Sequence, residues 1–166
     1  MLKYLNYLEK TVRKFGLFGS FLLPVLVCII VVNVIARYGF DIGLIELEEL
    51  QWHLNATAVL LCLGLAYQDD SHVRVDIFHI KFSKRKKALF EFLGCVFLLI
   101  PFVISIIWYA WDLFAYSFSI LEGSPMPSGL PARYVIKFIF FFGFLLLFLQ
   151  ACLTAIKSFL TYKTGR

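Results

Sequence analysis

Four long apolar runs, separated by short charged or turn-forming stretches, are the feature that most limits what this chain can become. They cover approximately residues 15–36, 45–67, 88–112 and 132–159. Because a helix rises about 1.5 Å per residue, roughly 20 apolar residues cross a hydrocarbon layer about 30 Å thick. The runs are too long and too uniform for the core of a soluble domain. They predict an all-α integral membrane protein with four transmembrane helices.

Composition and the placement of charge support this class and argue against others. Of the 166 residues, 61% are hydrophobic, and the mean hydropathy is +0.83, whereas a soluble domain is typically about 45–50% apolar. The formal net charge is +5, but the Lys and Arg residues stand at the ends of the apolar runs rather than along one polar face. That placement argues against binding of nucleic acid. We expect a single membrane domain over residues 1–166.

The sequence has no pattern typical of catalysis, a cofactor or a metal site. It contains neither a Gly-rich phosphate loop nor an HExxH motif, and its three histidines are not spaced to hold a haem between helices. Its cysteines lie inside apolar runs without a CxxC spacing, which favours packed thiols over disulfides: Cys28, Cys62, Cys95 and Cys152. We therefore expect no enzyme, no catalytic residue, no cofactor and no metal.

The basic residues predict how the chain lies in the membrane. We expect residues 1–14 to form an amphipathic helix on the membrane surface and the first span to stay uncleaved. Residues 68–87 form a second basic, amphipathic segment at the interface, and Ser83 is placed to cap the next helix. One side of the membrane receives most Lys and Arg residues, and the other receives only Arg37, Arg133 and Lys137. The positive-inside rule then places both termini in the cytoplasm.

The second run opens with an acidic cluster that continues into the membrane as a polar stripe. Glu46, Glu48 and Glu49 belong at the headgroup level, because carboxylates are costly in hydrocarbon. On a helix, one face carries this cluster and the next positions along it, namely Glu48, Gln51 or Trp52, Asn55 and Val59. A lipid-facing surface would not carry such a stripe. We expect it to face another protein or the interior of a bundle.

Two features mark the far ends of the third and fourth runs. Trp108 and Trp111 are expected to anchor the third span at the membrane interface, where aromatic residues gather. Residues 117–131 form a loop stiffened by Gly and Pro. Lys137 lies about one turn inside the fourth span, where it can either reach out to the headgroups or pair with an acid on a neighbouring helix.

Several short motifs, taken in order, resemble a known family. They are NVIARYGF at the end of span one, ELEEL at the start of span two and GLAYQDDSHVRVDIF at its end. The last span, GLPARYVIKFIFFFGFLLLFLQ, starts after a proline and ends near a Gln. With the four-span layout, these motifs resemble the small membrane subunit of tripartite ATP-independent periplasmic (TRAP) transporters, the DctQ-like Q subunit. His53 and the basic SKRKK run depart from many members.

The resemblance implies a function that hydropathy alone does not. Such transporters combine a periplasmic substrate-binding protein (DctP-like), a large elevator-type membrane subunit (DctM-like) that carries substrate and sodium, and the small subunit. The small subunit is expected to have no transport site of its own. It would brace the large subunit in the bacterial inner membrane, contact membrane lipids and help to dock the binding protein. Substrates in the family are mostly organic acids, including dicarboxylates and sialic acid.

The family motifs and the polar stripe of the second run together predict roles for particular residues. The partner interface is expected to include Arg37, Glu48, Glu49, Trp52 and Asn55. At the cytoplasmic end of span two, a salt bridge or lipid headgroups are expected to engage His72, Arg74 and Asp76. The residues alone leave two other functions open, which are a stand-alone small exporter and the membrane anchor of a redox enzyme.

Overall fold

The fold is described from a computed structural model, which places residues 2–69 and 83–164. That part of the chain is built from helices, so the predicted all-α class is confirmed. Their bounds are Leu2–Gly39 for α1, Ile45–Gln68 for α2, Lys84–Gly94 for α4, Ile100–Ser119 for α5 and Tyr134–Thr164 for α6. A π-helical turn of five residues, Cys95–Leu99, joins α4 to α5.

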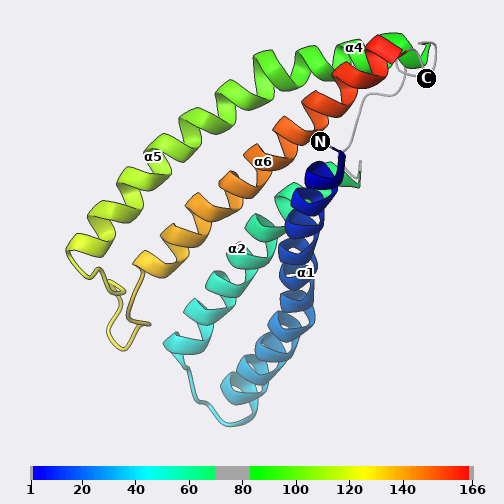
Figure 1. Ribbon diagram of the computed structural model, residues 1–166. Helices are drawn as coiled ribbons and strands as arrows, with labels where there is room; N and C mark the ends of the chain where they lie inside the picture. Colours follow the sequence, from blue (N-terminus) through cyan, green and yellow to red (C-terminus); the bar gives the residue numbers. More distant parts are fainter. Residues whose placement is uncertain (1, 70–82, 165–166) are drawn as a thin grey trace.

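Two antiparallel hairpins make up the bundle (Figure 1). α1 and α2 form the first hairpin, α5 and α6 form the second, and the two meet where α2 packs along α6. α1 therefore lies outside α2, and α5 lies outside α6. The chain termini and α4 lie at one end, which we call the terminal end. The loops that follow α1 and α5 lie at the other, which we call the loop end.

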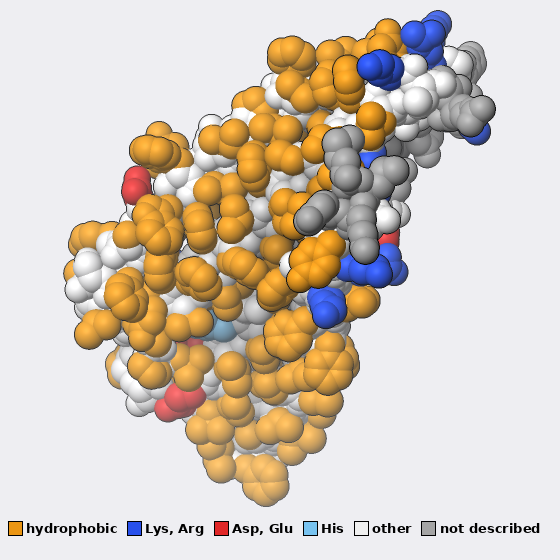
Figure 2. Space-filling view, in the orientation of Figure 1, with side chains coloured by type: hydrophobic (Ala, Val, Ile, Leu, Met, Phe, Trp, Pro, Cys, Tyr) orange, Lys and Arg blue, Asp and Glu red, His pale blue; other side chains and the backbone are white. Residues whose placement is uncertain are grey.

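Three segments are long and apolar enough to cross a membrane, judged by length and composition: Leu5–Gly39, Lys84–Ser119 and Tyr134–Thr164. Figure 2 shows the surface between the two ends covered mainly by hydrophobic side chains, with Lys and Arg toward the terminal end. α2 has nearly its predicted bounds, 45–68 against 45–67, but it is not among the three segments. Its first three turns carry several Glu, Gln, His and Asn residues, which lower its hydropathy. The count of four spans therefore stays a prediction.

The structure does not separate a surface helix from the first span. α1 runs unbroken from Leu2 to Gly39, although the sequence predicts an amphipathic helix over 1–14 and a span over 15–36. The apolar side of the early segment packs on protein, because Leu5 is 7% exposed and Val12 is fully buried. The separate amphipathic helix is therefore not confirmed, and the same apolar periodicity serves contacts within the bundle.

α4, the π-helical turn and α5 together form the third predicted run and extend it. The Ser83 hydroxyl accepts a hydrogen bond from the N–H of Lys86 at 3.5 Å, so the predicted cap of α4 is confirmed. Pro101 is the second residue of α5, one residue after the π-helical turn. Proline has no N–H and its ring crowds the carbonyl one turn earlier, so a widened turn before it relieves the conflict. α5 then continues to Ser119, beyond the predicted end at residue 112.

The helices approach closely where small residues face a neighbouring backbone. Gly64 of α2 lies against both Val12 of α1 and the carbonyl of Leu146 on α6. Gly143 of α6 lies so close to α2 that a Cβ added there would stand 2.7 Å from the carbonyl oxygen of Leu60. Between membrane helices this packing supplies much of the attraction, because lipid chains are as apolar as the side chains they touch.

Aromatic side chains join α5 to α6. The ring centroids of Trp111 and Phe141 lie 5.2 Å apart, and those of Phe114 and Phe138 are separated by the same distance. Both pairs are tilted, in the range where aromatic rings attract. The Phe-rich centre of the fourth predicted run is thus a helix–helix seam.

Two glycine-to-alanine substitutions test the packing. In Gly143→Ala the new methyl group meets the α2 backbone, so we expect overpacking to cost about 1–3 kcal/mol and to lower the apparent melting temperature in detergent. Gly94→Ala is the matched control, because a Cβ at Gly94 meets nothing within 4 Å. There alanine should raise helix stability by roughly 0.5–1 kcal/mol. Equal shifts for both variants would contradict the close contact between α2 and α6.

Candidate partner-binding surface at the loop end

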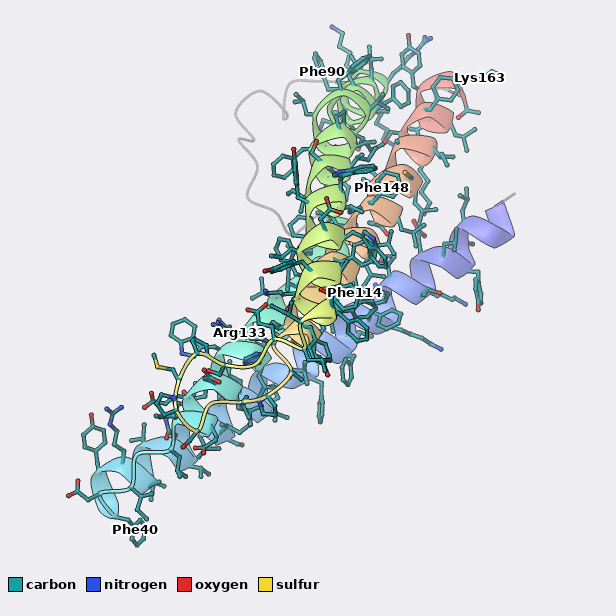
Figure 3. All side chains as sticks on the ribbon, turned by 90° about the vertical axis from the view of Figure 1, so that its left-hand side faces the viewer. Phe40, Phe90, Phe114, Arg133, Phe148 and Lys163 are labelled. Carbon is teal, nitrogen blue, oxygen red and sulfur yellow. The ribbon has the colours of Figure 1, made fainter. Side chains whose placement is uncertain are left out.

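Glu49, in the first two turns of α2, holds the loop of residues 120–133 against the bundle. Its carboxylate accepts a hydrogen bond from the backbone N–H of Leu130 at 2.7 Å and another from the Ser124 hydroxyl. Ser124 in turn accepts from the N–H of Met126 at 3.1 Å. Figure 3 shows the loop crossing in front of α2, with Arg133 at its end. One carboxylate on α2 therefore fixes two points of the connection between α5 and α6.

A second carboxylate fixes the start of this loop. Glu122 accepts hydrogen bonds from the Lys137 ammonium and from the Ser117 hydroxyl, the latter at 2.7 Å. These two donors, Lys137 first, hold the pKa of the Glu122 carboxyl below its usual value, so that it stays ionised at neutral pH. The sequence left two possibilities for Lys137. The structure shows the paired one, with the acid in the loop rather than on a neighbouring helix.

The same loop contains strained backbone. Leu121, Ser128 and Ala132 have φ angles of 48°, 65° and 66°, in the left-handed region that costs a residue with a side chain roughly 1–2 kcal/mol. Such positions persist only where surrounding contacts hold them. The hydrogen bonds of Glu49 and Glu122 supply contacts of that kind, so the loop's shape depends on both carboxylates.

Arg37 and Glu48 join the two ends of the short turn between α1 and α2. The guanidinium and the carboxylate are 3.0 Å apart, and the side chains are 58% and 42% exposed. An exposed pair of this kind contributes about 0–1 kcal/mol, so it orients the turn more than it stabilises the fold. The side chains of Tyr38 and Phe40, next along the chain, are 82% and 70% exposed, so no other part of the described chain covers them.

A hollow of about 390 Å³ opens between α2 and the loop of residues 120–133. Glu48, Glu49, His53 and Arg133 give it charge and polarity, and the exposed indole of Trp52 forms part of its apolar wall. His53 Nδ1 lies 2.7 Å from the Glu49 carbonyl oxygen, so the neutral ring donates from Nδ1 and leaves Nε2 as an acceptor. Exposed aromatic groups among mixed charges are typical of a protein-binding surface.

The polar stripe of α2 faces away from the bundle. Trp52 and Val59 are 75% and 53% exposed, and Asn55 between them is exposed as well. On the other side of the helix, Ala58 and Leu61 are buried. The sequence predicts that this stripe faces another protein or a bundle interior. For Trp52, Asn55 and Val59 the structure excludes the interior of this chain's own bundle, whereas the side-chain nitrogen of Gln51 is buried.

The predicted interface residues lie at or near the loop end. Four of them lie close together there, namely Arg37, Glu48, Glu49 and Trp52. Asn55 follows one turn later, on the same face of α2 as Trp52. Contact of these residues with a partner stays a prediction. The predicted residues His72, Arg74 and Asp76 lie outside the described part of the chain. Trp108 and Trp111 are 70% and 49% exposed on α5, and their role as membrane-interface anchors also stays a prediction.

Sequence reasoning missed the contacts that hold the loop. Glu122 is the only acid in that loop and Lys137 lies in the first turn of the next helix, so the sequence contained a signal for their pairing. The bond from the Leu130 N–H to Glu49 had none, because a backbone group carries no mark in the sequence.

The terminal end is held by polar contacts of its own. The Tyr67 hydroxyl donates to Glu91 at 2.9 Å, and Arg13 pairs with Asp69 at 3.2 Å. Across residues 2–69 and 83–164, no three His, Cys, Asp or Glu side chains are placed together to hold a metal ion.

Two neighbouring glutamates test the loop anchor. Glu49→Ala removes the acceptor of the Leu130 N–H, and we expect hydrogen–deuterium exchange at that amide to speed up by roughly tenfold or more. Glu48→Ala is the control, because within residues 2–69 and 83–164 the Glu48 carboxylate bonds to Arg37 and to no amide of the loop. Unchanged exchange at Leu130 in Glu49→Ala would mean that the anchor does not hold in solution.

Comparison with known proteins places these features in a family. A family model matches residues 26–161, which include α2, α4, α5, most of α6 and the whole loop end. Its description is "Tripartite ATP-independent periplasmic transporters, DctQ component". No curated protein matches the chain. Because the family match extends over most of the sequence, the chain belongs to the DctQ component family and is the small membrane subunit of a TRAP transporter.

Proposed function

We propose that this small subunit crosses the bacterial inner membrane four times, with both termini in the cytoplasm. α1, the α4–α5 segment and α6 are candidate spans. α2 runs antiparallel to α1 and packs along α6, so a chain that crosses on α1 returns on α2. The Lys and Arg residues of the terminal end then face the cytoplasm, and the loop end faces the periplasm.

Fusions of alkaline phosphatase, which is active only outside the cytoplasm, test this topology. We expect activity when the enzyme follows Ile42 or Met126, because both positions lie in loops at the loop end. A fusion after Ser83 or at the C-terminus should be inactive, and a reporter that works in the cytoplasm should give the reverse pattern. If Ile42 and Ser83 report the same side, α2 does not cross the membrane.

The second part of the proposal is that the subunit braces the large membrane subunit and does not itself carry the organic acid or sodium. Within residues 5–69 and 83–164, the buried polar side chains are Asn33, Ser117 and Gln150, and none is charged. Most charged side chains lie toward the ends of the helices, where several pair with one another, and Asp112 lies about two turns before the end of α5. This distribution supports assigning substrate and sodium binding to the large subunit.

The exposed stripe on α2 is the observation that carries the bracing role. Hydrocarbon is a poor cover for the Asn55 amide, because lipid offers it no hydrogen-bond partner. A neighbouring protein surface can bond the amide and pack on Trp52, which is 75% exposed. We assign that surface to the large subunit, and we assign the hollow beside Trp52 and Arg133 to docking of the periplasmic binding protein.

Co-purification with the large subunit of the same transporter tests the bracing role. In Trp52→Ala we expect the complex to weaken roughly tenfold, because buried aromatic anchors dominate interfaces. Sodium-driven uptake in proteoliposomes with the binding protein should fall in parallel. Phe21→Ala on α1 is the control, since Phe21 is also highly exposed, at 65%.

Two results would count against this role. One is a wild-type chain that purifies without the large subunit and moves solute alone in liposomes. The other is an equal loss of complex in Trp52→Ala and Phe21→Ala, because the α2 stripe would then be no more important than any exposed ring.

A further inference from the structure

A groove of about 430 Å³ runs between α5 and α6, on a part of the surface that the function proposed above does not use. Its walls are almost entirely apolar and include Trp108 and Trp111 of α5 and Phe141 and Phe148 of α6. Figure 3 looks onto α5, with Phe148 on the α6 side. Asp112 lies at the end of the groove nearer the loop end, and it is the one charged residue in the lining.

Asp112 lies farther inside a helix than the other acids near the loop end. Between Glu91 and Glu122 it is the only charged residue in the sequence. Its side chain is exposed, and no residue in the described part of the chain hydrogen-bonds or ion-pairs with it. Glu48, Glu49 and Glu122 each have a donor within this chain. Asp112 is therefore a carboxylate that this subunit leaves for another group to satisfy.

The surroundings of Asp112 define the chemistry of that group. Acyl chains cannot neutralise a carboxylate, and ionised side chains within membrane spans are found paired or facing a protein interior. Trp108 and Trp111, which are 70% and 49% exposed, line the same groove, and the faces of indole rings attract cations. A carboxylate among exposed indoles suits the side chain of Lys or Arg, whose apolar stem can lie in the groove while its head reaches the charge.

The groove is long enough for a second helix to pack along it for about two turns. On α5 it extends from Ile104 to Asp112, which is about 12 Å of helix, or two turns. A membrane helix laid along it would contact both walls over that length.

We propose that the groove between α5 and α6 receives a transmembrane helix of the large subunit, and that a Lys or Arg of that helix pairs with Asp112. This inference rests on the function proposed above and adds a second contact to the α2 stripe. The ion pair sets the depth and register of the two subunits, while the apolar walls supply the packing.

Charge variants of Asp112 test the pair in the co-expressed complex. Asp112→Asn keeps the size of the side chain, and we expect the complex to dissociate at least tenfold more readily, because it strands the partner's buried cation. Asp112→Lys should abolish the complex, and exchanging the partner's basic residue for Glu should restore it. The melting temperature of the isolated Asp112→Asn chain should not fall, which separates loss of the partner from loss of the fold.

Photo-crosslinking tests the occupant of the groove directly. A photoreactive amino acid at Leu145, which lines the groove and is 39% exposed, should attach to the large subunit. The same group at Leu23 of α1, at 45% exposure, should label mainly lipid. Adducts from Leu145 to lipid alone, or to a second copy of this chain, would overturn the proposal.

The two proposals fail in different ways. If the wild-type complex forms but neither Asp112 variant weakens it, the groove inference is wrong and the bracing role stands. If the wild-type chains form no complex at all, both are overturned.

Discussion

The fold depends on the close approach of α2 to its two neighbours. At Gly64 the α2 backbone lies between Val12 of α1 and the Leu146 carbonyl of α6, with no room for a methyl group on the α1 side. Gly143 repeats the arrangement from the α6 side against Leu60. Since lipid chains compete with side chains for apolar contact, short-range packing of this kind has to hold membrane helices together. It also explains how α2 takes a central place despite its polar first turns, because neighbours cover one side of α2 and leave its polar stripe for a partner.

Hydrogen bonds and ion pairs of charged side chains add to this packing at the two ends of the bundle. The helices are apolar in their middles, so the polar contacts gather at the two ends, where they connect segments that packing leaves apart. At the loop end, Glu49 and Glu122 tie the loop after α5 to α2 and α6 and support three residues in left-handed backbone. Each bond to a charged acceptor is stronger than a neutral one. The loop end is therefore a fixed surface rather than a flexible connection, as the proposed docking of a second protein would require.

The sequence predicted the helices well because long apolar runs have few alternatives in a membrane. The second run was placed to within one residue at either end, at 45–67 against Ile45–Gln68. Prediction from the sequence failed where contacts between helices decide where a segment lies. Residues 1–14 have the periodicity of a surface helix, yet Leu5 and Val12 are buried within the bundle, and α1 has no break. The Lys137 ammonium could reach the lipid headgroups or pair with an acid, and the sequence does not show that the path of the loop brings Glu122 to it. Of the candidate interface, the polar stripe on α2 was readable from spacing, whereas the bond from Leu130 to Glu49 was not.

On the proposed function, the partner is an elevator-type subunit, which needs a frame that does not deform while its transport domain moves. Helices in backbone contact at glycines resist sliding, because each closer approach meets hard repulsion and each separation loses dispersion contacts. A frame must also be fastened at more than one point, or it pivots. The α2 stripe and the groove at Asp112 lie on different hairpins of the bundle, so a partner held at both cannot rotate about either contact. On the proposed function, the distribution of satisfied and unsatisfied polar groups follows from that requirement. Carboxylates that shape this chain are bonded within it, and those polar groups that fasten it are left exposed.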